Sequence, residues 1–326
     1  MTGAISPRIL FTSLSAKSAL YEEVLGNARS YAPNAFVIGC DCDPYCLASN
    51  KVEKFIEVPR LGLLSDTELL DICQRNHITH ILPSSDLELP FWSEKKKLLE
   101  EYFITTWVSD FTFVKFCEDK LVFAKKWANA SIPSVPTYQQ PELSNIERWV
   151  VKERYGSGSR NIALDLGVKE AEKVASESQN EVVFQPFIKG KEFTAEIWVS
   201  RSNQCYGPLL RWRNKVIMGE AHQTTTFRNL KWESLLRSVF LHHPGAYGHC
   251  IAQVMVDISG NLNLIEINPR MGGASSLALR GGLYSIAWHL MEDSGCLHNV
   301  PYSPVFQNGI SLTKNNGVVS YQFDLS

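Results

Sequence analysis

The sequence of 326 residues lacks the features that would place it in several common classes of protein. No apolar run comes near the roughly 20 residues that a membrane-spanning helix needs. The short apolar piece at residues 9–11 is not the long one of a secretory signal peptide. The 32 basic and 34 acidic residues give a net charge of −2, which does not favour nucleic acid as a partner. We therefore expect a cytoplasmic protein, with neither a membrane nor a nucleic acid as partner.

The cysteines show no pattern typical of disulfides or of zinc. Most of the eight lie in apolar segments, as Cys73 and Cys250 do, which is typical of reduced, buried thiols. Cys40, Cys42 and Cys46 form one cluster, but no second Cys/His pair stands at a zinc-ligand spacing from it. The composition thus favours an intracellular protein and disfavours zinc.

Two common nucleotide-binding motifs are also missing. The first expected strand, at residues 8–12, is followed by a turn without glycine, so the G-x-G-x-x-G fingerprint of a dinucleotide-binding domain is absent. The Gly/Ser-rich stretch at residues 153–162 does not contain the Gly-Lys-Ser/Thr of a P-loop. Such a loop still offers backbone N–H groups to phosphate, and Lys152 precedes it, but hairpin turns of this composition are common without any ligand.

The first third of the chain alternates apolar strands with helical segments. Strands are expected at residues 8–12, 35–40 and 79–83, with a helix between the first two and another opened by the capping box of Ser65 and Glu68. This order predicts a parallel sheet in an α/β domain. Asp86 and Glu88 follow the third strand, where they either face a ligand cleft or cap the next helix.

The rest of the chain predicts a mixture of helices and antiparallel strands. Ser109 and Asp110 are expected to cap a short helix, and a longer helix opens at residues 118–120. A strand and a return strand flank the Gly/Ser loop, which forms the turn between them. Further strands are expected at 181–188, 193–199, 206–212 and 216–218. Residues 250–257 and 261–268 form a hairpin around Gly260, which brings Gln253 towards Glu266.

The end of that hairpin places polar side chains at every second position: Glu266, Asn268 and Arg270. In an extended chain these side chains share one face. A carboxylate beside an amide oxygen suits Mg²⁺, and an arginine beside them suits phosphate. The alternative is a strand end whose polar groups face water.

Taken together, these pieces resemble the ATP-grasp superfamily, and most closely the branch of the carbamoyl phosphate synthetase large subunit and the carboxylate–amine ligases. The resemblance implies an α/β, Rossmann-like, pre-ATP-grasp domain at residues 1–110. It also implies an α+β ATP-grasp fold of two subdomains, the lid at 111–183 and the Mg-ATP floor at 184–326.

The resemblance implies a role for each residue that matches a family position. Arg270 and Lys152 would stabilise the reacting phosphates, with Lys120 as a further phosphate contact. The residues implied to bind ATP also include Gly156, Ser157, Gly158 and Ser159 of the lid loop, Gln185 and Phe187 beside adenine, and Glu192 at the ribose. Gln253, Glu266 and Asn268 would bind Mg²⁺, with Mn²⁺ as an alternative.

The implied function is an ATP-dependent ligase that activates a carboxylate as an acyl phosphate, releases ADP and passes the acyl group to an amine, with an amino acid as one candidate. Another phosphoryl-transfer enzyme, such as a kinase or carboxylase, and a non-catalytic ATP-binding protein remain alternatives. A homodimer or a partner chain that completes the site is also open. Candidate substrate residues are Arg211, Arg213, Arg280, Glu220 and His222, although the arginine-rich strand is equally compatible with a solvated sheet edge.

Overall fold

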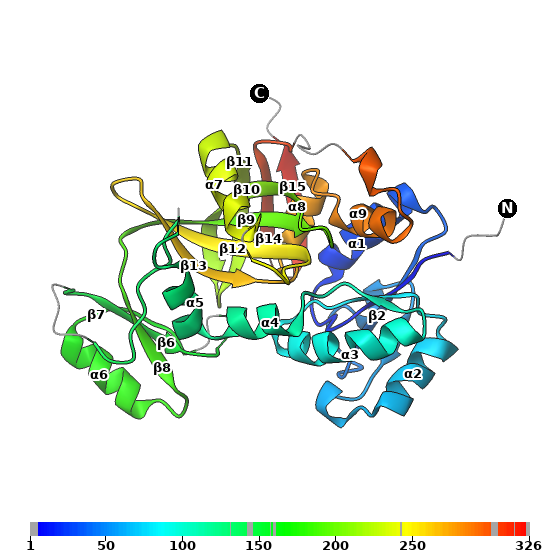
Figure 1. Ribbon diagram of the computed structural model, residues 1–326, viewed down its shortest axis with the longest axis horizontal. Helices are drawn as coiled ribbons and strands as arrows, with labels where there is room; N and C mark the ends of the chain where they lie inside the picture. Colours follow the sequence, from blue (N-terminus) through cyan, green and yellow to red (C-terminus); the bar gives the residue numbers. More distant parts are fainter. Residues whose placement is uncertain are drawn as a thin grey trace.

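The computed structural model describes residues 6–130, 132–141, 146–156, 158, 161–241, 243–300, 306–315 and 317–323. The strands of these residues form three sheets (Figure 1). None of the described helices combines the length and the apolar character that crossing a bilayer requires.

The first sheet is parallel and has the strand order β3-β2-β1-β4-β5. The central strand β1 is almost wholly apolar, as expected of a strand covered on both faces. The capping box predicted at Ser65 and Glu68 is present at the start of α2. The α/β prediction for this part of the chain is therefore confirmed. Its elements are β1 (Arg8–Phe11), α1 (Ser18–Tyr31), β2 (Phe36–Asp41), β3 (Phe55–Glu57), α2 (Asp66–Arg75), β4 (His80–Leu82), α3 (Leu89–Glu101) and β5 (Thr105–Thr106).

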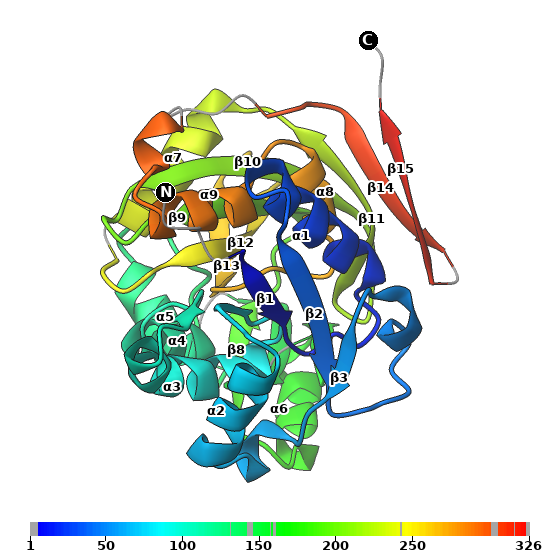
Figure 2. The same ribbon diagram turned by 90° about the vertical axis from the view of Figure 1, so that its right-hand side faces the viewer.

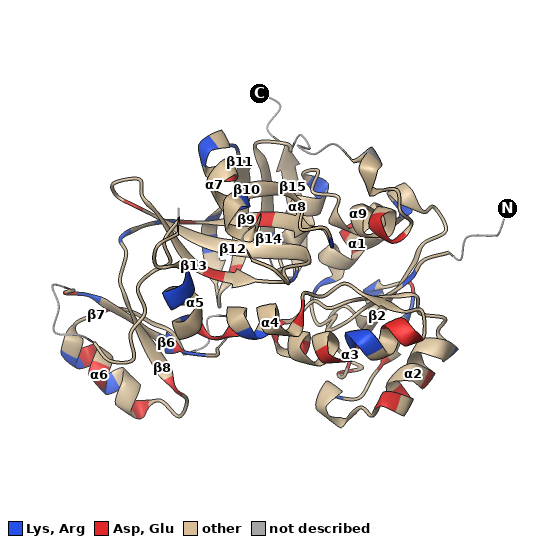
Figure 3. Ribbon diagram, viewed as in Figure 1, with Lys and Arg blue, Asp and Glu red and all other residues tan. Residues whose placement is uncertain are grey.

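The second sheet is a small antiparallel one with the order β7-β6-β8, and α6 packs against it. Acidic and basic residues are interspersed along α6, as they are along α3 (Figure 3). Strand β8 ends at Pro186 and lies at an edge of the sheet, where a missing N–H is tolerated. The elements are α4 (Phe111–Glu118), α5 (Lys120–Trp127), β6 (Trp149–Glu153), β7 (Ala163–Leu166), α6 (Val168–Glu177) and β8 (Val182–Pro186).

The third sheet has seven strands in the order β13-β12-β9-β10-β11-β14-β15. Its last two strands form a hairpin that projects at one edge (Figure 2). Helices α8 and α9 pack against α1 and so join this part to the parallel sheet. The elements are β9 (Gly190–Val199), β10 (Cys205–Ile217), β11 (Glu220–Phe227), α7 (Leu230–Leu241), β12 (Gly248–Asp257), β13 (Leu262–Asn268), α8 (Ser275–Arg280), α9 (Ser285–Asp293), β14 (Ile310–Asn315) and β15 (Val318–Phe323).

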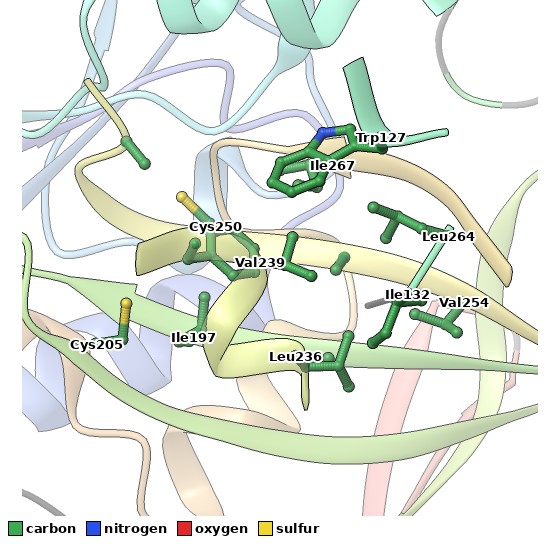
Figure 4. Close-up of a cluster of buried hydrophobic side chains, with 14 of the residues drawn as sticks. Trp127, Ile132, Ile197, Cys205, Leu236, Val239, Cys250, Val254, Leu264 and Ile267 are labelled. Carbon is green, nitrogen blue, oxygen red and sulfur yellow. The ribbon is translucent and has the colours of Figure 1, made fainter. Parts of the chain in front are cut away.

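Alternation along the strands of this large sheet gives it one apolar face and one polar face. Phe193, Ala195 and Ile197 of β9 belong to a buried cluster with side chains from α5, α7, β12 and β13 (Figure 4). Glu192, Thr194 and Glu196 alternate with them along the strand and therefore point to the opposite side. The sheet therefore presents polar side chains on the face that the α7 cluster does not cover.

Two local predictions were wrong. The strands expected at 206–212 and 216–218 are one strand, β10, because the polar residues between them continue its pairing with β11 through a bulge. Asp110 precedes α4, but its side chain makes no capping hydrogen bond.

The domain division remains a proposal. The boundary at 183/184 would fall inside β8, which pairs with β6 along its whole length. We therefore propose that the second unit extends through Pro186.

Candidate functional site

The hairpin of β12 and β13 forms one side of the candidate site. Gln253 lies directly opposite Glu266 in the register, as predicted, and a bulge follows at Val254. Ile267 points into the core, so Glu266 and Asn268 face the other way. The Asn268 amide donates a hydrogen bond of 3.1 Å to Glu266 Oε1. One carboxylate and two amide groups thus lie side by side on the polar face of the sheet.

Two buried lysines carry the opposite charge. Lys120 and Lys152 are each 7% exposed. Burial lowers the pKa of Lys152 to about 8, although the charge of Glu266 opposes that effect. Burial alone would raise the pKa of Glu266, but Lys152 and Lys120 hold it below its usual range. Glu266 is therefore a carboxylate at neutral pH, with ammonium groups as its neighbours.

Lys120 also connects the site to the Gly/Ser loop. Its Nζ atom donates a hydrogen bond of 2.6 Å to the carbonyl of Gly156. The lysine at the start of α5 therefore holds one end of that loop beside Glu266.

The oxygen atoms of Gln253, Glu266 and Asn268 suit a hard divalent cation. No cluster of three or more His, Cys, Asp or Glu side chains suited to a metal occurs among the described residues. Mg²⁺ needs no such cluster, because it usually takes one or two carboxylates and completes its coordination with water and substrate phosphates. The donor set fits that habit, and it does not fit zinc.

Arg270 joins this group to the parallel sheet. Its Nε atom donates a hydrogen bond of 2.8 Å to Asp86 Oδ1, and a second nitrogen contacts the other carboxylate oxygen. Glu88, in contrast, accepts hydrogen bonds from the backbone N–H groups of Ser84 and Ser85. Of the two roles left open for the residues after β4, Asp86 faces the site, and Glu88 caps the short helical turn at residues 86–88 that leads into α3.

A cavity of about 510 Å³ lies between these walls. The parallel sheet contributes residues that follow β1 and β4, and the large sheet contributes its polar face. Of the predicted site residues, the following line it: Gly158, Arg211, Arg213, Glu220, His222, Gln253, Glu266, Asn268 and Arg270. Lys120 and Gly156 line a smaller neighbouring cavity that shares Glu266 and Asn268.

The arginine-rich strand is not a solvated edge at Arg211 and Arg213. Arg211 is 2% exposed, and its Nε atom lies 2.5 Å from Glu196 Oε1. Arg213 forms an ion pair of 2.9 Å with Glu192. A bulge after Arg213 ends the alternation with Lys215. Each arginine therefore reaches the cavity already held by a carboxylate.

Glu220 forms an ion pair with Lys314 of β14, and the lysine also donates a hydrogen bond of 2.9 Å to the carbonyl of Gly273. A side chain at position 273 would collide with Glu220, since a Cβ there would lie 1.6 Å from its Oε1 atom. The hairpin of β14 and β15 therefore forms part of the cavity wall.

The structure does not bring every predicted residue to these cavities. Gln185 hydrogen-bonds Thr137, and the backbone N–H of Phe187 donates to the Arg148 carbonyl. Arg280 binds Glu23 of α1 and does not line the cavity. Glu192 and Lys152 are close enough to Glu266 for their charges to interact with it, but they line neither cavity. Ser157 and Ser159 lie outside the described residues.

Sequence patterns missed several residues that the fold places at the site. Lys17 and Lys314 line the cavity, and Glu196 holds Arg211 beneath it. Lys17 stands in the turn after the first strand. Because ligands bind at the carboxyl ends of such strands, that position is the one signal that could have identified Lys17. Glu196 and Lys314 follow ordinary strand alternation and carry no such signal.

Comparison with known proteins agrees with this arrangement. Residues 117–274 match the model of an ATP-grasp domain, and residues 9–106 match a PylC-like N-terminal domain. No curated protein matches the chain.

Several solved structures share the fold. N5-carboxyaminoimidazole synthetase from Staphylococcus aureus, complexed with ADP, has a TM-score of 0.69 at 15% identity, covering 95% of this chain and 82% of that one. The biotin carboxylase domain dimer of Hydrogenobacter thermophilus 2-oxoglutarate carboxylase, a complex with MgADP, ADP and bicarbonate, has a TM-score of 0.72 at 14% identity, with coverages of 95% and 74%. N5-carboxyaminoimidazole ribonucleotide synthetase from Thermus thermophilus has a TM-score of 0.67 at 12% identity, with coverages of 94% and 82%.

Proposed function

We propose, from the membership of this chain in the ATP-grasp superfamily, that it is an ATP-dependent ligase that joins a carboxylate to an amine. The observation that carries the proposal is the placement of Glu266 opposite Gln253, with the Asn268 amide hydrogen-bonded to Glu266 and with Lys152 and Arg270 beside it. This group collects cations and cation ligands where negative charge would accumulate. It suits phosphoryl transfer, which depends on positioning and charge stabilisation.

In the first step a carboxylate oxygen attacks the γ-phosphorus of ATP. A bond forms between that oxygen and phosphorus, the bond to the β-phosphate oxygen breaks, and ADP leaves. Mg²⁺, or Mn²⁺ in its place, supplies charge neutralisation when Gln253, Glu266 and Asn268 hold it. Lys120 and Lys152 bind phosphate oxygens, and Arg270 binds the acyl phosphate through its planar fork.

In the second step the amine nitrogen attacks the acyl carbon. The C–N bond forms, the bond from the acyl carbon to the phosphate oxygen breaks, and inorganic phosphate leaves while the nitrogen loses a proton. The acyl phosphate must be protected from water, and the Gly/Ser loop, of which Gly156 and Gly158 line the two cavities, would provide that cover. Gln185 and Phe187 would contact adenine, and Glu192 the ribose. Binding at these three residues requires their present contacts to rearrange.

Hydroxylamine trapping tests this function directly. The protein is incubated with Mg-ATP, hydroxylamine and a panel of carboxylic acids and amino acids. Bicarbonate is also tested, and for it only the release of ADP is measured. Hydroxamate and ADP in equal amounts with one acid is the expected result. Tight Mg-ATP binding without turnover on any acid would contradict the proposal and favour a binding protein.

Variants connect the activity to the residues. Glu266→Gln and Lys152→Ala are expected to lower the rate of ADP formation at least about a hundredfold, as loss of a charge-stabilising group does. Glu57→Gln, at an exposed residue of β3, is the matched control and keeps the wild-type rate. Full activity in both site variants would refute the assignment of the site, even if ligase activity is found.

A further inference from the structure

One of the cations around the main cavity differs from the others. Among the described residues, five lysines and arginines line it: Lys17, Arg211, Arg213, Arg270 and Lys314. Four of them form ion pairs: Arg211 with Glu196, Arg213 with Glu192, Arg270 with Asp86 and Lys314 with Glu220. Within the described chain, Lys17 forms none and donates hydrogen bonds only to neutral oxygens.

The amino group of Lys17 is fixed in position. Its Nζ atom donates 2.6 Å to the carbonyl of Ser13 and 3.1 Å to Ser84 Oγ. The Ser84 hydroxyl is itself held by the carbonyl of Thr12 at 2.5 Å. An ammonium group has three donors, so these contacts orient it and leave one donor for a further acceptor.

The surroundings of Lys17 favour an anion as that acceptor. Lys17 is half-buried, and the carboxylates of Glu88, Asp41 and Glu220 act on its charge although none of them forms an ion pair with it. A ligand anion would supply the direct counter-charge that these groups do not provide. Lys17 stands at the N-terminal end of α1, where no side chain caps the helix and no acidic residue occupies the first turn. Ala19 and Leu20 of that turn line the cavity beside Ser84 and Ser85. Helix N–H groups at such an end also favour negative charge.

The position in the cavity indicates which substrate carries the anion. Arg270, beside Glu266 and Asn268, lies where the carboxylate would be activated. Lys17 belongs to the wall formed by the parallel sheet, and the carboxylates of Asp86 and Glu220 also line the cavity and can accept hydrogen bonds from an amine. A molecule with an amine and an anionic group matches this distribution of charge.

We propose that Lys17, oriented by Ser84, binds a carboxylate or phosphate group of the amine-bearing substrate. This inference rests on the proposed ligase function, because it names the chemistry of that site's second substrate. It assigns the choice of amine to the wall after β1 and the activation of the acid to the β12–β13 hairpin.

Hydroxylamine separates the two substrates, because it replaces the amine and carries no anion. Lys17→Met is expected to form hydroxamate with unchanged kcat and unchanged KM for the acid. With matched amines, wild type should favour an amino acid over its amide, or a phosphorylated amine over its alcohol, by about tenfold or more in kcat/KM. Lys17→Met should lose that preference because its KM for the anionic amine rises. Lys17→Arg should keep part of the preference.

The control is Lys51→Met, an exposed lysine of the same domain, which should keep the preference. A preference retained in Lys17→Met, or absent from wild type, would overturn the proposal. A raised KM for the acid in the hydroxamate assay would also overturn it, because Lys17 would then bind the other substrate.

Equilibrium binding tests Lys17 even if no acid is activated. Glycine, glycinamide and inorganic phosphate are titrated into protein saturated with MgADP. Glycine or phosphate should bind wild type about tenfold more tightly than Lys17→Met, with glycinamide weak in both. Equal affinities in the two proteins, or no binding of either anion to wild type, would refute the role of Lys17. Failure of the ligase function would appear separately, as the absence of hydroxamate.

Discussion

The carboxylate of Glu196 is fully buried and binds groups from three elements. It accepts hydrogen bonds from Arg211 at 2.5 Å and from His249 Nε2 at 2.8 Å, and the Ser275 hydroxyl contacts it as well. Burial opposes its charged form, but Arg211, His249 and Ser275 together lower its pKa to about 2. Glu196 thus fixes one arginine of the cavity and the start of α8.

Replacing Glu196 by alanine is expected to lower the free energy of unfolding by about 3–5 kcal/mol, because Arg211 would remain buried without its partner. Urea unfolding at neutral pH measures the change. The double variant Glu196→Ala with Arg211→Met should lose less than the single one. Glu53→Gln, in the exposed pair with Arg29, is the control and should change stability by less than about 1 kcal/mol. A single variant as stable as wild type would contradict the role of Glu196.

At this scale the sequence predicted only those residues whose chemistry is visible in a short pattern. Glu266, Asn268 and Arg270 follow a period of two along one strand. Asp86 was foreseen as one of two alternatives, since strand position alone cannot tell a ligand contact from a cap. Lys17 and Glu196 depend on partners far away in the chain, which no local pattern contains.

Two glycines show how differently the elements tolerate a side chain. Gly26 is exposed in the middle of α1, and a Cβ there would meet nothing within 4 Å. Gly190 begins β9, and a Cβ there would lie 2.0 Å from the carbonyl oxygen of Val256 in β12. That neighbour is backbone of a paired strand and cannot rotate away.

Gly26→Ala is expected to raise the free energy of unfolding by about 0.5–1 kcal/mol, because alanine loses less conformational entropy in a helix. Gly190→Ala should lower it by about 1–3 kcal/mol, because β9 and β12 must separate locally. Urea unfolding of both variants gives the two signs. Equal effects from the two substitutions would show that the approach of β9 to β12 is looser than described.

Elements were predictable where periodicity and turn residues agreed. The β12–β13 hairpin has both signals, and its register follows from them. The extent of β10 was not predictable, because Arg213 and the polar residues after it resemble a loop, and only pairing with β11 keeps them extended. Asp110 marked the start of α4 correctly, but its side chain makes no capping hydrogen bond.

For the whole molecule, the order of elements along the chain predicted an α/β part followed by an α+β part. It did not predict how the two parts contact each other, because that contact depends on side chains from helices and strands that are far apart in the sequence. Asp293, at the end of α9, is such a contact. It accepts a hydrogen bond of 3.0 Å from Trp107 Nε1, after the last parallel strand, and contacts Arg201 between β9 and β10 at 2.5 Å. His80 of β4 lies 3.4 Å from it.

This contact should make stability depend on pH. Burial would raise the pKa of Asp293, but His80, Arg201 and Trp107 lower it to about 2, below the 3.8 of a free carboxyl. The unfolded chain then takes up the proton first as the pH falls. The stabilisation by Asp293 is therefore complete above about pH 5 and is lost as the pH falls through 4 towards 2. A shift of this size corresponds to about 2 kcal/mol.

Asp293→Asn is therefore expected to be less stable than wild type by about 2 kcal/mol at pH 7 and by much less near pH 2.5. Urea unfolding at pH 7, 5, 3.5 and 2.5 measures the difference at each pH. Asp71→Asn, in an exposed pair with Arg75, should differ from wild type by no more than about 0.5 kcal/mol throughout. A difference for Asp293→Asn that stays constant down to pH 2.5 would mean that the charge contributes nothing. The junction between the parallel sheet, α9 and the large sheet would then be held by packing alone.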